Sequence, residues 1–169
     1  MNAIKFIAVC ALLAGGNASF GHENLPHAAH NAPVVKEQKK EQMSWGIAGD
    51  TQAVARTITI RMTDDMRFTP RHIQVREGET VRLRAENKGQ VLHEIVIGTK
   101  AELDAHAEMM VKHPGMEHDE PYMAHVGAGK KGDIVWQFNR AGQFDFACLI
   151  AGHYQAGMTG TITVLPRKP

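Results

Sequence analysis

Residues 148–158 read CLIAGHYQAGM, and in this stretch Cys148, His153 and Met158 are each separated by four residues. The segment that follows, residues 159–165 (TGTITVL), alternates polar and apolar side chains in the manner of a half-buried β-strand. A short loop before such a strand can fold a thiolate, an imidazole and a thioether around one ion. This stretch therefore indicates both a β-rich fold and a metal site.

The donor atoms of this loop favour copper. Soft sulfur ligands stabilise the cuprous state, whereas imidazole serves both oxidation states. A second imidazole is needed to complete a trigonal set, and His93 supplies it from a strand far away in the sequence. Met158 is then a weak, longer axial ligand, and zinc is a poorer candidate because structural zinc sites use cysteine and histidine.

The structural alternative is that the cysteine and the histidine are simply buried core residues. A lone cysteine at a strand end is usually a small buried hydrophobe. Here the ordered spacing, the β-rich context and the lack of a disulfide partner act together, so we favour the copper interpretation.

Alternation of polar and apolar residues recurs through the rest of the chain from about residue 54. Short alternating segments separated by glycine-containing turns predict an all-β, antiparallel sandwich or barrel. One stretch, residues 99–112, has a helix-favouring mixture and predicts a single inserted helix. The predicted strands are residues 57–62, 72–76, 80–85, 91–97, 133–138, 143–147 and 160–165.

The N-terminal third differs in composition. Residues 1–21 contain Lys5, the apolar run 6–13 and then small residues, which is typical of a secretory signal peptide cleaved around residues 18–21. The run is too short to span a membrane, and no lipoprotein cleavage box precedes Cys10. We expect a flexible, histidine-containing arm over residues 22–52 and the folded domain over residues 53–169.

Charge and cysteine content narrow the functional classes. The formal net charge is +1, and removal of Lys5 with the signal peptide leaves a net charge of zero. No polybasic patch favours nucleic acid or an anionic membrane surface as a partner. Cleavage also removes Cys10, so Cys148 becomes the one cysteine of an exported protein and must be reactive, intermolecular or bound to a metal.

Two further groups of soft and borderline ligands are candidates for additional copper. The weaker group lies in the arm, where ordering would be costly in entropy, and contains His22, His27 and His30. The stronger group begins in the second half of the predicted helix and continues to the next predicted strand. Its alternative is that the methionines pack in the core while the histidines are solvated. This second group contains His106, Met109, Met110, His113, Met116, His118, Asp119, Met123 and His125.

Residues 148–164 resemble the C-terminal ligand loop of the plastocyanin, azurin and rusticyanin superfamily. This resemblance implies a Greek-key cupredoxin sandwich of about seven to eight strands and a type 1 copper site. The implied ligands are His93, Cys148, His153 and Met158. Residues 45–50, 62–70, 93–97 and 105–121 are similar to the CopI-type periplasmic cupredoxins of bacterial copper tolerance. The chain departs from many electron-transfer cupredoxins by having Glu94 after the first histidine, where Asn or Ser is frequent.

Two functions follow from these features. The first is a periplasmic copper-tolerance protein with a redox-active centre, which could also oxidise Cu(I) by means of the additional Met/His site; whether it is an enzyme stays open. The second is a soluble one-electron carrier that docks on a periplasmic redox protein through an apolar patch near His153. A metallochaperone without redox chemistry would make poor use of a thiolate site.

Overall fold

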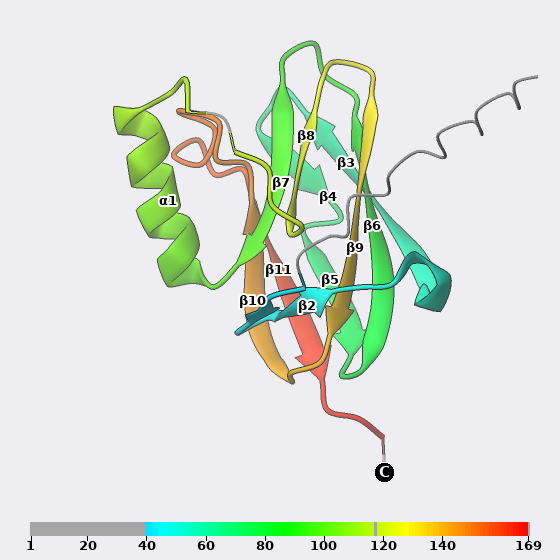
Figure 1. The fold of residues 1–169 in the computed structure, drawn as a ribbon. Coiled ribbons are helices and arrows are strands. Elements are labelled where there is room, and N and C mark those ends of the chain that lie inside the picture. The colour runs from blue at the N-terminus through cyan, green and yellow to red at the C-terminus, as the bar shows by residue number, and fades with distance from the viewer. Residues whose placement is uncertain (1–39, 117, 169) are drawn as a thin grey trace, which may run out of the picture. The chain divides into compact units, whose positions relative to one another are not determined.

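The computed structural model describes residues 40–116 and 118–168. In this part of the chain two β-sheets enclose an apolar core, and one α-helix lies outside them (Figure 1). One sheet has five strands in the order β5 (His72–Arg76), β11 (Thr159–Leu165), β10 (Gly142–Ala147), β7 (His93–Gly98) and β8 (Met123–Val126). The other has six, in the order β1 (Gln42–Met43), β2 (Gly46–Ala48), β9 (Lys131–Phe138), β6 (Glu79–Asn87), β3 (Arg56–Thr63) and β4 (Arg67–Thr69).

The expected all-β sandwich with one inserted helix is confirmed, but its pairing is mixed. β3 runs parallel to β6 and β5 runs parallel to β11, whereas the other strand pairs in the described ranges are antiparallel. Each parallel pair joins strands that are far apart in the chain: β4 and β5 lie between β3 and β6, and β6 to β10 lie between β5 and β11. Alternation of residue type reports which face is buried and says nothing about the direction of the neighbouring strand.

The core between the sheets contains the inward side chains of the alternating strands. Trp136, Phe138 and Phe146 are among its largest fully buried members. The rings of Phe68 and Phe146 pack edge to face with their centroids 5.0 Å apart. Because Phe146 precedes Cys148 by two residues on the same strand end, this packing fixes the start of the 148–158 loop.

The helix α1 (Lys100–Lys112) covers the outer face of β7 and β10. It begins with a capping box, in which the side chains of Thr99 and Glu102 each bond the backbone of the other residue. A second, smaller core lies beneath it, and every residue of β7 is buried as a result. This core contains Val96, Leu103, Ala107, Met110, Met123, Ala147 and Leu149.

The N-terminal boundary of the folded domain differs from the expected one. Residues 42–48, which the sequence places in the flexible arm, form β1 and β2, and β2 pairs with β9. Trp45 is only 3% exposed, and Nε1 of Trp136 donates a hydrogen bond to its carbonyl oxygen at 3.1 Å. The end of the expected arm is therefore part of the sheet.

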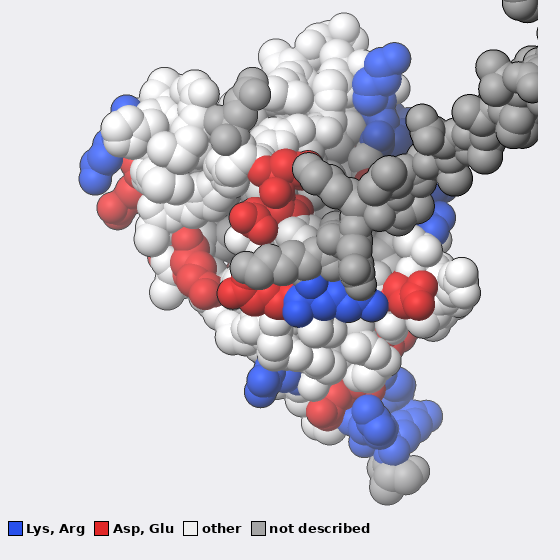
Figure 2. Space-filling model, viewed as in Figure 1, with Lys and Arg blue, Asp and Glu red and all other residues white. Residues whose placement is uncertain are grey.

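The predicted signal peptide and the first part of the predicted arm, residues 1–39, lie outside the described residues. Within the described ranges, no helix has the length and apolar character needed to cross a bilayer. Lysine, arginine and acidic side chains are dispersed in small groups over the face drawn in Figure 2.

Candidate metal centre

Neighbouring strands bring the predicted ligands together. His93 is the first residue of β7, and Cys148 directly follows β10, which pairs with β7 in antiparallel register. The backbone N–H of Glu94 points at the sulfur of Cys148 at 3.4 Å. The sheet register therefore places a residue from position 93 beside a loop that begins at position 148.

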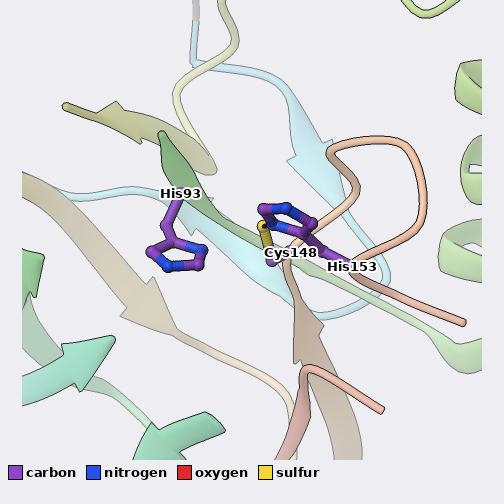
Figure 3. Close-up of side chains that lie close together, drawn as sticks. All are labelled: His93, Cys148 and His153. Carbon is purple, nitrogen blue, oxygen red and sulfur yellow. Dashed lines mark hydrogen bonds between the residues drawn. The ribbon is translucent and has the colours of Figure 1, made fainter. Parts of the chain in front are cut away.

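His93, Cys148 and His153 offer three ligand atoms that all lie within 4.8 Å of one another. Sγ of Cys148 is 3.3 Å from Nδ1 of His153, and the two imidazole ring centroids are 5.0 Å apart. Figure 3 shows His93 on one side of the cluster, with Cys148 and His153 on the other. His93 and Cys148 are fully buried whereas His153 is partly exposed, so the centre reaches the surface along the His153 ring.

The orientation of the His93 ring is set by Asp64. Nε2 of His93 lies 3.0 Å from Oδ1 of Asp64, and the other carboxylate oxygen accepts a hydrogen bond from the backbone of Gln90 at 2.7 Å. Nδ1 of His93 is buried and has no hydrogen-bond partner among the described residues. A histidine that gives one nitrogen to a carboxylate and leaves the other free is arranged as a metal ligand.

Asp64 was not identified from the sequence. It lies between β3 and β4 in a stretch without a motif, so only its position in space reveals its role. A Cβ at Gly89 would come within 1.8 Å of the Asp64 carboxylate, which shows how closely the chain passes around this side chain.

The ligand loop is closed by its own backbone. The N–H of Cys148 donates to the carbonyl of Met158, and the N–H of Met158 donates to the carbonyl of His153, both at 3.1 Å. Met158 is fully buried against the main core. These backbone bonds hold Met158 beside Cys148 and His153.

Burial controls the protonation of the centre. Burial raises the pKa of the Cys148 thiol to about 12, so without a metal the thiol keeps its proton. Burial also lowers the pKa of His153, with a further contribution from His93, so this imidazole is neutral. A bound cation would compensate the charge of the thiolate, and two imidazoles with one thiolate are a donor set that suits copper.

Glu94 is a buried carboxylate, only 1% exposed, directly beside the centre. Its Oε1 accepts a hydrogen bond from the backbone N–H of Leu149 at 2.7 Å, and its Oε2 lies 2.9 Å from Nε2 of His125 on β8. Burial raises the pKa of Glu94, whereas His125 and the Leu149 N–H oppose this shift. Glu94 therefore connects the ligand loop with β8.

The second predicted ligand group spans buried and exposed positions. Met110 and Met123 are buried in the core beneath α1, and Met110 also lines a pocket with His118 and His125, so a ligand role for these methionines stays a prediction. Met109, His113, Met116 and Asp119 are exposed. The rings of His106 and His118 lie tilted against each other with their centroids 4.6 Å apart, and the ring centroid of His125 lies 6.5 Å from that of His118. The third predicted group, His22, His27 and His30, lies outside the described residues.

The chain matches a known family over most of its length. Residues 52–165 match the copper binding proteins of the plastocyanin/azurin family. The chain belongs to this family, and its His-Cys-His cluster lies within the matched residues. It is therefore a copper-binding cupredoxin.

Within this family, the chain is similar to proteins named CopI. The chain is 45% identical over 163 residues to the copper-resistant cuproprotein CopI of Rubrivivax gelatinosus, with 94% of this chain and 93% of the relative covered. It is 32% identical to the protein of the same name from Pseudomonas aeruginosa, with 73% and 83% covered. The resemblance to CopI-type proteins inferred from the sequence is confirmed.

Solved structures of cupredoxins share the fold. Reduced auracyanin from Roseiflexus castenholzii superposes with a TM-score of 0.58 at 22% identity, covering 67% of this chain and 99% of that one. An azurin from Methylomonas sp. strain J gives a TM-score of 0.54 at 18% identity, with 68% and 100% covered. These similarities concern the fold alone.

Proposed function

We propose that this chain is a periplasmic copper-tolerance protein whose redox-active copper is bound by His93, Cys148 and His153, with Met158 as the axial ligand. The convergence of three ligand atoms within 4.8 Å of one another carries this proposal. Copper held there would supply one-electron Cu(I)/Cu(II) chemistry. The partly exposed ring of His153 would let an electron pass between the copper and a partner at the surface.

Copper tolerance is supported by the relatives, three of which are named copper-resistant cuproproteins. The proposed activity is oxidation of cuprous ion, the more toxic form, taken up at the additional Met/His site. Each Cu(I) oxidised gives up one electron, and a redox protein of the same compartment is the proposed acceptor. The signal peptide predicted over residues 1–21 would deliver the chain to that compartment.

The test combines a growth assay with a rate measurement. A host that lacks its own copy of the gene should regain copper tolerance with the wild-type chain but not with Cys148→Ser. The purified protein should oxidise Cu(I) faster than buffer does when an oxidised redox protein is present. A Cys148→Ser chain that restores full tolerance would rule the proposal out.

A soluble electron carrier is the second candidate, and the surface beside the centre favours it. Val91 and Leu92, next to His93, are 44% and 46% exposed. In Figure 2 the region over the ends of β7 and β8 and the loop after β10 is largely uncharged. Apolar patches of this kind suit brief docking of a redox partner.

The Met/His segment distinguishes the two functions. In a carrier, replacing His113, Met116 and His118 together should leave both electron exchange and copper tolerance unchanged. In a cuprous oxidase, the same triple variant should lose copper tolerance while keeping the absorption of the first centre.

A further inference from the structure

Three histidines from three separate segments meet outside the first centre. His106 lies on α1, His118 in the segment between α1 and β8, and His125 on β8. Since metal–nitrogen bonds are about 2.0–2.1 Å, two rings on one ion have centroids roughly 5 to 6 Å apart. The observed ring separations of 4.6 and 6.5 Å lie on either side of this range.

Three ring nitrogens of His106 and His118 lack partners in the described structure. Nε2 of His106 and both nitrogens of His118 are buried and make no hydrogen bond within the described ranges. Unpaired buried polar atoms cost free energy, and chains usually avoid them. A cation bound between the rings would satisfy these nitrogens. Burial lowers the pKa of His106, with His118 adding to the effect, so its imidazole is neutral and free to bind.

The third ring is held by a carboxylate. Nε2 of His125 lies 2.9 Å from Oε2 of Glu94, which leaves Nδ1 of His125 available for a metal. This is the arrangement of a ligating histidine supported by an outer carboxylate. Glu94 is 1% exposed, so its charge also requires a positive partner close by. A metal ion on His125 would supply it.

An open pocket gives solvent access to the cluster. Its lining includes His118, His125 and the exposed thioether of Met116, and it also includes Leu92 and Ile150, which border the first centre. Imidazoles with a nearby thioether suit cuprous copper better than hard cations such as magnesium or calcium. The pocket therefore gives a soft cation access to the rings of His118 and His125, and His118 lies against His106.

We infer that His106, His118 and His125 form a second site, which binds cuprous ion and which Glu94 joins to the first centre. The inference rests on the copper function proposed above and names the residues that receive its substrate. The three rings come from different segments and lie farther apart than the ligands of the first centre. Among the described residues, only His93, Cys148 and His153 have ligand atoms that all lie within 4.8 Å of one another. Binding would draw the segment that carries His118 toward α1 and β8.

Glu94 gives the second site a direct connection to the first. Its backbone N–H contacts Sγ of Cys148, and its Oε1 accepts from the backbone of Leu149. Its Oε2 faces His125. One residue thus touches the thiolate ligand, the ligand loop and a ring of the second site.

The test is an anaerobic Cu(I) titration against a chromophoric cuprous chelator. The exported chain is used with His22, His27 and His30 replaced by alanine, so that the arm cannot add equivalents. This background should bind two equivalents, and adding His118→Ala should reduce them to one. His113→Ala is the matched control, because His113 is exposed and lies outside the triad, and it should keep two.

Folding of the variant is checked by its melting temperature without copper. Removing two unpaired buried nitrogens should leave the temperature of apo His118→Ala equal to or above that of the background protein. A single equivalent in the background, or two in His118→Ala, would overturn the second site. The visible band of the first centre is recorded on the same samples after cupric loading. Its absence would contradict the proposed function, whereas its presence with one cuprous equivalent contradicts only the second site.

Discussion

Individual side chains of the first centre are arranged to bind a metal. Cys148 is fully buried and retains its proton, while Nδ1 of His93 is buried without a partner. The unpaired nitrogen is unfavourable in an ordinary core, because a buried polar atom without a partner costs free energy. Copper would supply that partner and would bind the folded chain only, so we expect copper binding to stabilise the fold markedly.

Asp64 orients His93, so its removal should weaken copper binding without abolishing the centre. We expect Asp64→Ala to lower copper affinity by about 10- to 100-fold, the usual effect of removing an outer-shell partner. Asp65→Ala is the control, since Asp65 is exposed and bonds only Thr63 in the described structure. Competition with a copper chelator measures both variants, and equal affinities would show that Asp64 has no positioning role.

The protonated thiol also predicts a pH dependence. With a pKa of about 12, Cys148 must release one proton on binding copper throughout the range pH 7 to 9. Cu(I) affinity at the first centre should therefore rise by about tenfold per pH unit. His153 adds no slope there, because burial lowers its pKa and it is already neutral. An affinity that stays flat over this range in chelator competition would contradict the buried, protonated thiol.

The local sequence was sufficient to predict the copper ligands but not the residues that orient them. Cys148, His153 and Met158 share one loop, and their donor chemistry restricts the metal. Asp64 and the outer contacts of Glu94 depend on long-range packing, which leaves no pattern of spacing. The burial of Met110 and Met123 likewise depends on which faces of α1 and β8 are covered in the fold.

At the scale of secondary structure, alternation identified the long strands and missed the short ones. The seven predicted segments correspond to β3, β5, β6, β7, β9, β10 and β11. The missed strands β1, β2, β4 and β8 have two to four residues, too few for a period to be visible. Their existence depends on a neighbouring strand, as the pairing of β2 with β9 shows.

Gly46 in β2 tests whether this short strand belongs to the folded domain. Its φ is +135°, and a Cβ there would lie 2.3 Å from the carbonyl oxygen of Gln137. Gly46→Ala should lower the free energy of unfolding by about 2–4 kcal/mol in urea titrations. Gly127→Ala is the control, since its Cβ would meet only Lys130 at 3.8 Å, and should change stability by less than about 0.5 kcal/mol. Equal stabilities would mean that β2 contributes nothing.

At the scale of the whole molecule, the inserted helix distinguishes this chain from a sandwich made of two β-sheets alone. α1 covers β7 and β10, and the segment after it returns to β8 beside the ligand loop. The same insertion supplies His106 and His118, whereas His125 and Glu94 come from the sheet. The insertion thus places a group of potential ligands next to the first centre.

Export is a prediction for the whole chain. If residues 1–21 are a signal peptide, the protein recovered from the periplasm should lack Lys5 and Cys10 and begin close to residues 19–22. Intact mass spectrometry of the periplasmic fraction measures this directly. A periplasmic protein of full-length mass, or a full-length protein retained in the membrane fraction, would contradict it.

The central claim is that Cys148, His93 and His153 bind one redox-active copper. The most direct measurement is a cupric titration of the mature protein that follows the visible thiolate-to-copper charge-transfer band. The band should grow to saturation at one equivalent, bleach on addition of a reductant, and be absent in Cys148→Ser. A wild-type protein that binds copper tightly without this band, or a Cys148→Ser protein that retains it, would contradict the account.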